Sequence, residues 1–255
     1  MRRVLVGVSL GPRCAVAVRR AHALAERFRA SLHIVHVLPR ATPALAQNPT
    51  VMEEVIRRWT RTEAAVELDS DTVHLESGPP AFRIEEVAKQ IRADLVVLGS
   101  TARHGLGTTL ALTAFMSRAV LVASTERPTG DVIAATDLET NGFPVVKCAV
   151  RVAAALGRKV TVVHNVAPRG STAAGTLADR MRYLEGLAHE FPRLRAANLA
   201  RSTSNAEAVD EIASARDADI VVLGVRAGRG HTLAGLLDRE PSRSVLAIPI
   251  VGSSS

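Results

Sequence analysis

The segments ADLVVLGS, residues 93–100, and ADIVVLGV, residues 218–225, decide the fold of this chain. Each has an aspartate, four apolar residues without alternation, and then a glycine. An uninterrupted apolar run predicts a strand buried on both faces, as in a parallel sheet covered by helices. Ligands of open α/β sheets bind outside the carboxyl ends of the strands, so the loops after Gly99 and Gly224 are the first places to look for a site.

The segments around these two strands also repeat along the chain. DVIAATD at 131–137 repeats RVLVGVS at 3–9, and KVTVVHN at 159–165 repeats SLHIVHV at 31–37, both at an offset of 128. Strand and helix patterns alternate in each copy, which predicts a parallel sheet with helices on both faces. We therefore predict two tandem domains, residues 1–127 and 128–255.

Each copy predicts a βαβαβαβαβ unit. In the first, we expect strands at 4–9, 31–38, 72–76, 94–98 and 119–123, and helices at 12–28, from a Thr50 cap onward, at 81–92 and at 108–116. In the second helix we expect Val51, Val55, Ile56 and Trp59 to face inward, and in the third we expect the pair Glu85 and Glu86 on the solvent face. The second copy adds helices at 178–190 and 205–216 and a last strand at 244–251.

Composition limits the function classes. The chain has 255 residues, 47% of them hydrophobic, and no apolar run approaches the ~20 residues that cross a bilayer. We therefore predict a cytoplasmic protein that does not bind membranes. The net charge of +7 is dispersed along the chain, and only 3% of residues are aromatic. Because nucleic-acid binding favours a basic stripe with aromatic platforms, we predict no nucleic-acid partner.

Residues that commonly carry chemistry have simple structural explanations here. Cys14 and Cys148 fall in predicted helices without metal-ligand spacing, so we expect reduced thiols and no metal. His36 and His164 occupy equivalent repeat positions, which favours a structural role. The chain contains no H-E-x-x-H, G-x-S-x-G or P-loop motif, so we predict that it is not an enzyme.

The repeated strand and turn motifs of the chain together resemble the universal stress protein family in its tandem form. The resemblance rests on the end of the first strand, the strand LHIVHV, the Gly-Pro turn before residue 81, and ADLVVLG. It implies two open five-stranded parallel-sheet domains of the adenine-nucleotide α-hydrolase-like, Rossmann-like α/β class. It also implies that the last strands, 119–123 and 244–251, pair in an intramolecular pseudo-dimer. A further homodimer is compatible with the family.

The resemblance also implies where an adenine nucleotide, ATP or AMP, would bind. Some members place an aspartate after the first strand, a residue beside adenine after the second, and G-x2-G-x9-G-[ST] after the fourth. In the first domain, the matching positions are Ser9, Val37, Gly99, Ala102, Leu112 and Thr113, with Arg103 and Gly105 in the loop. In the second domain, they are Asp137, Asn165, Gly224, Ala227, Leu237 and Asp238, with Arg226 in the loop.

The phosphate motif is incomplete in both domains, so two hypotheses stay open. One is a stress-response regulatory module with a weak adenine-nucleotide site, and the other is a nucleotide-independent interaction module without a ligand. If either domain binds ATP, we expect the first, because Thr113 keeps the hydroxyl. In the second domain the Asp238 carboxylate would repel the phosphates.

Overall fold

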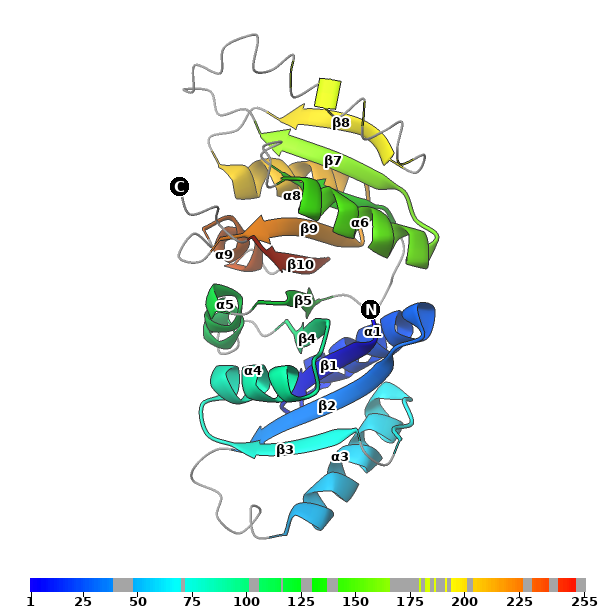
Figure 1. Ribbon diagram of the computed structural model, residues 1–255, viewed down its shortest axis with the longest axis vertical. Helices are drawn as coiled ribbons and strands as arrows, with labels where there is room; N and C mark the ends of the chain where they lie inside the picture. The colour runs from blue at the N-terminus through cyan, green and yellow to red at the C-terminus, as the bar shows by residue number, and fades with distance from the viewer. Residues whose placement is uncertain are drawn as a thin grey trace. The chain divides into compact units, whose positions relative to one another are not determined.

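The computed structural model describes residues 1–38, 48–69, 72–100, 106–115, 117–124, 130–136, 142–165, 179, 182–183, 186, 191, 194–200, 204–226, 231–238 and 243–250. The chain forms two compact units, Met1–Glu126 and Arg127–Ser255. Figure 1 shows that each unit combines strands with helices packed along them.

The first unit is an open parallel sheet in the strand order β3-β2-β1-β4-β5. Its strands are β1 (Arg3–Val8), β2 (Ser31–Leu38), β3 (Val73–Ser77), β4 (Leu95–Gly99) and β5 (Ala119–Ala123). Its helices are α1 (Pro12–Phe28), α3 (Pro49–Ala64), α4 (Pro80–Gln90) and α5 (Leu106–Phe115). Helix α1 packs with α3, and α4 packs with α5.

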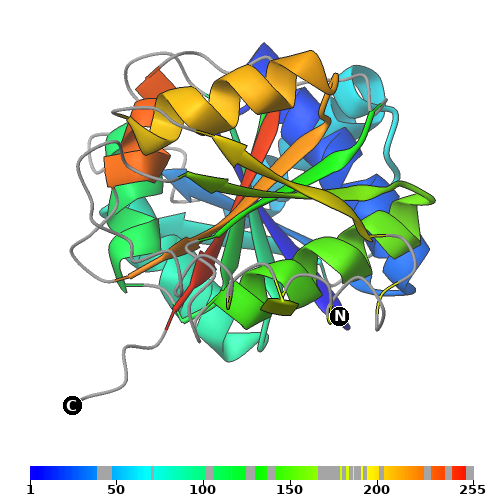
Figure 2. The same cartoon turned by 90° about the horizontal axis from the view of Figure 1, so that it is seen from above.

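The second unit repeats this topology in the order β10-β9-β6-β7-β8, again with parallel pairs. Its strands are β6 (Val132–Ala135), β7 (Val160–Asn165), β8 (Leu194–Ala200), β9 (Ile220–Val225) and β10 (Ser244–Pro249). Its helices are α6 (Gly142–Leu156), α8 (Asn205–Ala215) and α9 (His231–Asp238). Figure 2 shows α6 in yellow-green and α8 in gold on opposite faces of this sheet.

The predicted α/β fold with two parallel five-stranded sheets is confirmed. Most of the helix predicted at 178–190 lies outside the described residues. The pairing expected between the last strands of the two units stays a prediction.

The cores are aliphatic, as the low aromatic content requires. In β1, Val4, Leu5 and Val6 are fully buried, and in β4, Val96 and Val97 are fully buried as well. Burying each such side chain contributes roughly 1.5–3 kcal/mol, which explains why continuous apolar runs form the central strands.

The prediction for α3 was wrong in its cap and in part of its inward face. Asn48 caps the helix, since its side-chain oxygen accepts a hydrogen bond from the Val51 amide, and Pro49 occupies the first turn. Val51 and Val55 are 51% and 43% exposed. The buried stripe is instead Met52, Ile56, Thr60 and Ala64, a strict i, i+4 series that lies one position away from the expected valines.

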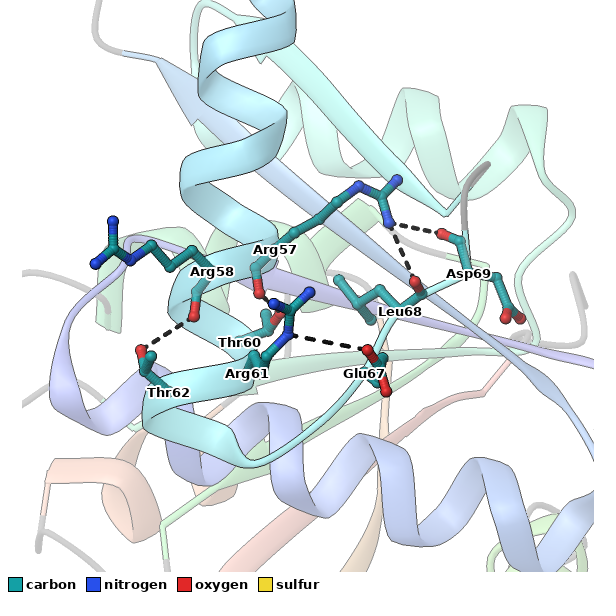
Figure 3. A network of polar contacts seen from close by, with 8 residues as sticks. All are labelled: Arg57, Arg58, Thr60, Arg61, Thr62, Glu67, Leu68 and Asp69. Carbon is teal, nitrogen blue, oxygen red and sulfur yellow. Dashed lines mark hydrogen bonds and ion pairs between the residues drawn. The ribbon is translucent and has the colours of Figure 1, made fainter.

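The carboxyl-terminal part of α3 is tied to the segment that follows it (Figure 3). Arg57 Nη1 donates to the carbonyl oxygens of Leu68 at 3.2 Å and Asp69 at 2.9 Å. The Thr60 hydroxyl is fully buried and donates to the Arg57 carbonyl at 2.9 Å. The Thr72 hydroxyl also donates to the Asp69 carbonyl at 2.8 Å, so these bonds together hold the end of α3 to the segment before β3.

Glu85 was expected on the solvent face, and this expectation was wrong. Glu85 is 3% exposed, and its Oε1 lies 3.2 Å from Arg118 Nη1 and 3.3 Å from Lys89 Nζ. Arg118, just before β5, also donates through Nε to the Ala93 carbonyl at 2.8 Å. A helical pattern cannot show that a distant arginine will pair with one of its acidic residues, which is why the prediction failed.

The second unit contains the equivalent ion pair. Asp210 and Arg243 lie 125 positions after Glu85 and Arg118, the offset that also relates the two central strands. Arg243 Nη1 lies 3.4 Å from Asp210 Oδ1, and its Nη2 donates to the Ser214 hydroxyl at 2.8 Å. We call these two pairs, Glu85–Arg118 and Asp210–Arg243, the acid–arginine pairs. Each joins a helix, α4 or α8, to the residue just before the last strand of its unit.

Substitution of Arg118 by alanine should strongly destabilise the first unit. It leaves the Glu85 carboxylate buried without its main partner, which typically costs about 3–5 kcal/mol. The matched control is Lys89→Ala, which removes the other cation at the same carboxylate. Lys89 is 63% exposed, so its loss should cost no more than about 1 kcal/mol. Urea denaturation of both variants checks this, and equal losses would show that burial of the pair is unimportant.

Candidate functional site

The first unit has a cavity at the carboxyl end of its sheet. Strand β1 lies between β2 and β4, so the strand order reverses direction at β1. In open α/β sheets a crevice forms at such a point, outside the carboxyl ends of the strands. The cavity has a volume of about 260 Å³. Its walls are mostly apolar and include Val35, Val37, Ile84 and Leu98.

Three of the predicted site residues line this cavity together: Ser9, Val37 and Gly99. Gly99 has a packing role, because a Cβ at this position would lie 2.9 Å from the Arg13 carbonyl oxygen in α1. Only glycine lets the first turn of α1 approach the end of β4 this closely. Ser9 is exposed, and its amide donates to the sulfur of Cys14 at 3.3 Å.

The threonines at this cavity differ from the one predicted. Thr113 is buried, and its hydroxyl donates to the Leu110 carbonyl at 3.0 Å, one turn back along α5. Thr108 and Thr109, in the first turns of α5, line the cavity instead. Their position at the helix end that follows the glycine-rich loop is the sequence signal that could have identified them. Ala102, Arg103 and Gly105 lie outside the described residues.

The second unit has a cavity at the equivalent place, with a volume of about 220 Å³. It brings together three predicted residues: Asn165 at the end of β7, and Gly224 and Arg226 at the end of β9. Asp137 lies outside the described residues. Asp238 is exposed at the end of α9 and is not among the described residues that line this cavity.

Sequence reasoning missed three polar residues of the second cavity: Thr136, Asn205 and Thr232. Asn205 is the first residue of α8, and its Oδ1 accepts a hydrogen bond from Asn165 Nδ2 at 2.7 Å. This amide pair links the ends of β7 and α8 across the cavity. By the offset of 125, Asn205 is equivalent to Pro80 of the first unit, and Pro80 lines the first cavity. The repeat itself was therefore the missed signal.

The repeated histidines have the structural role that was expected. His36 Nδ1 donates to the Val8 carbonyl at 2.8 Å, and His164 Nδ1 donates to the Thr136 carbonyl at 3.0 Å. Since a carbonyl oxygen only accepts, both rings carry the proton on Nδ1 in these bonds. Each bond ties the end of the second strand of its unit to the end of the first.

The two cavities differ in chemistry. The described lining of the first has hydroxyls and a thiol but no charged side chain. The second has two amides, two threonines, a histidine and Arg226. A cavity with a cation and convergent amides suits a polar, anionic ligand better than one with aliphatic walls.

The strand order and the cavities at the strand ends define a Rossmann-like α/β protein. A profile of the universal stress protein family matches residues 1–123. Universal stress protein A homolog 1 of Coxiella burnetii is 26% identical over 115 residues, covering 41% of this chain and 80% of the relative. Homolog 2 of the same organism is 29% identical over 130 residues, covering 47% and 87%.

Solved structures agree in fold. A universal stress protein from Archaeoglobus fulgidus superposes with a TM-score of 0.74 at 13% identity, covering 97% of this chain and 98% of that one. A putative universal stress protein from Pseudomonas aeruginosa gives 0.71 at 17% identity, covering 98% and 94%. Residues 1–123 thus match the universal stress protein family, and the two repeated units of the chain fit the tandem form of that family.

The described residues contain no candidate for a membrane span or for a metal site with three or more His, Cys, Asp or Glu ligands. No helix among them combines the length and apolar character needed to span a bilayer. Within the same residues, no three His, Cys, Asp or Glu side chains are grouped so that they could hold a metal ion.

A histidine pair on β2 and β3 lines neither cavity. His33 Nδ1 lies 3.2 Å from His74 Nε2, the rings stack with centroids 5.4 Å apart, and the Ser31 hydroxyl lies 3.1 Å from His33 Nε2. Burial lowers the pKa of His33, and repulsion from His74 and Arg3 lowers it further. Burial also lowers the pKa of His74, although Glu76 opposes this shift.

The histidine pair should make stability depend on pH. Because both pKa values lie below the ordinary value of 6.5, the unfolded chain binds more protons than the folded chain in that range. The free energy of unfolding should therefore be highest above pH 6.5 and fall as the pH drops below it. Denaturation between pH 7.5 and 5.5 checks this for the wild type and for a His33→Gln, His74→Gln variant, whose pH dependence should be flatter.

The matched control for this pH dependence is His22→Gln. His22 lies in α1 near Glu26 and away from the pair, so its substitution should not remove the fall in stability on acidification that the wild type shows. A wild-type stability that rises on acidification through pH 6.5 would contradict the account.

Proposed function

We propose that this universal stress protein is a cytoplasmic stress-response binding module whose second unit takes an adenine nucleotide, ATP or AMP, and acts by binding without turnover. The observation that carries the proposal is that Asn165, Asn205 and Arg226 line one cavity at the carboxyl ends of parallel strands. The match to the universal stress protein family supports the assignment to stress response.

The lining of the second cavity matches the parts of a nucleotide. Val145, Val209 and Leu223 offer apolar contact for a base. The Asn165 and Asn205 amides can donate to and accept from ring nitrogens or ribose hydroxyls. The Arg226 guanidinium suits phosphate oxygens, which it can bind with two parallel hydrogen bonds.

The size of the cavity indicates how much of the ligand it encloses. At about 220 Å³ it is smaller than the roughly 300–1,000 Å³ of pockets for drug-sized ligands. It therefore suits the nucleoside portion, with the phosphates directed toward Arg226 and solvent. Much of the phosphate contact is then exposed, and we expect weak binding.

Two observations favour the second unit over the first as the nucleotide site. The Thr113 hydroxyl donates within α5, and Thr113 does not belong to the lining found for the first cavity. In the second unit, the exposed Asp238 lies outside the lining found for the cavity, so its carboxylate is not placed to repel a bound phosphate there. We therefore assign the nucleotide to the second unit.

Calorimetric titration with ATP, AMP and adenosine tests the proposal. Arg226→Gln should weaken ATP binding about tenfold or more, because a hydrogen bond to a charged group contributes roughly 1.5–3 kcal/mol. The same variant should bind adenosine as the wild type does, because adenosine has no phosphate for the guanidinium.

The matched control is Arg13→Gln in the first unit. Arg13 lies at the start of α1, where its Nη1 donates to the Ser100 carbonyl at 3.4 Å beside the first cavity. It should leave ATP affinity unchanged. Loss of ATP binding in Arg13→Gln but not in Arg226→Gln would place the nucleotide in the first unit. No heat from any of the three ligands would favour the nucleotide-independent interaction module.

A further inference from the structure

The histidine pair His33 and His74 lies toward the amino ends of its strands, whereas the cavity of the first unit lies at the carboxyl ends. Val35, two residues after His33 on β2, lies opposite His74 of β3. Because side chains alternate along a strand, the two rings project from the same face of the sheet. Strand β3 is the edge strand, and both histidines are only half-buried, so solvent reaches the rings.

The hydrogen bonds around His33 determine which of its ring nitrogens carries the proton. The Ser31 hydroxyl donates to the Arg2 carbonyl at 3.5 Å, so its oxygen can accept from His33 Nε2–H at 3.1 Å. His33 Nδ1 then keeps a lone pair and accepts from His74 Nε2–H at 3.2 Å. Metal-binding histidines are commonly held in this way, with one nitrogen donating to a neighbouring group and the other facing the metal position.

The distance between the two facing nitrogens matches that of a metal chelate. Two imidazole nitrogens bound to one tetrahedral Zn²⁺ at about 2.0–2.1 Å lie about 3.3 Å apart. The distance from His33 Nδ1 to His74 Nε2 is 3.2 Å, and the ring planes are inclined by only 28°. A small rotation of each ring therefore turns both lone pairs toward one metal ion without movement of either strand.

The charges around the histidine pair are mixed. Glu76, two residues beyond His74 on the same face of β3, attracts a cation. Arg3 of β1 repels one, while its Nη1 is held by the Ile91 carbonyl at 2.7 Å. Both histidines have a pKa below the ordinary value, so the rings are neutral at pH 7.5 and keep their lone pairs.

We propose that His33 and His74 form a binding site for a divalent transition metal ion of the class of Zn²⁺ and Cu²⁺, with water at the remaining positions. Imidazole nitrogens suit these ions, whereas Mg²⁺ prefers oxygen ligands. On binding, His74 moves its proton from Nε2 to Nδ1, so Nε2 coordinates while the ring stays neutral. With two protein ligands, the site binds more weakly than a closed four-ligand site.

Calorimetric titration of the chelator-treated 255-residue chain with ZnCl₂ at pH 7.5 tests the proposal. Ser31→Ala should weaken Zn²⁺ binding about tenfold, because loss of a group that orients a ligand typically costs about 10–100-fold in metal affinity. His33→Gln and His74→Gln remove a ligand and should each cost at least as much. CuCl₂ should bind more tightly than ZnCl₂, and MgCl₂ should not bind at this pair.

The matched control is His22→Gln, which removes a histidine of α1 outside the pair and should leave Zn²⁺ affinity unchanged. No Zn²⁺ binding by the wild type would overturn the proposal. Binding that persists at wild-type affinity in a His33→Gln, His74→Gln variant would also overturn it, because the ion would then lie elsewhere. The site belongs to the first unit, so either result leaves the nucleotide assignment to the second unit intact.

A crystal structure of the wild-type chain grown with ZnCl₂ identifies the ligands directly and does not depend on whether a variant folds. We expect an anomalous-scattering peak within bonding distance of His33 Nδ1 and His74 Nε2. Anomalous peaks only at other positions would overturn the proposal.

Discussion

The parallel pairing of β1 with β2 on one side and β4 on the other is the constraint on which the first unit depends. Val6 lies opposite Ile34 and Val97 at once, and it is fully buried. The chain reaches the two neighbouring strands through helices of different layers, which opens a crevice beyond the end of β1. The cavity and its lining follow from that arrangement. Strand β6, between β7 and β9, imposes the same constraint on the second unit.

The acid–arginine pairs fix the helix that forms one wall of each cavity. In α4, Ile84 lines the cavity, and Glu85, the next residue, joins Arg118. In α8, Val209 lines the cavity, and Asp210 joins Arg243. Both pairs anchor the wall helix to the start of the last strand, so the geometry of the wall depends on a charge interaction, with a buried carboxylate in the first unit and a half-buried one in the second. Such pairs add little stability compared with apolar packing, but losing one partner is costly.

Most of the fold could be predicted from the sequence because it depends on local periodicity. The helix expected at 12–28 forms as Pro12–Phe28, and the strand expected at 31–38 forms as Ser31–Leu38. The errors concern residues whose surroundings depend on distant segments. Glu85 is buried because Arg118 pairs with it, and Val51 is exposed because the buried stripe of α3 begins at Met52.

The candidate site was predictable only in part for the same reason. Aligned motif positions brought Ser9, Val37 and Gly99 together correctly, and likewise Asn165, Gly224 and Arg226. The residues at helix starts, Thr108, Thr109 and Asn205, were missed because their positions depend on where each helix begins. The sequence favoured the first unit because of Thr113 and Asp238. Neither side chain is among the described residues that line the two cavities.

A crystal structure of the 255-residue chain grown with ATP tests the central claim most directly. The account predicts density for an adenine nucleoside in the cavity lined by Asn165 and Asn205, with phosphate density toward Arg226. Nucleotide density only in the cavity beside Ser9 and Cys14, or empty cavities at saturating ATP, would contradict it.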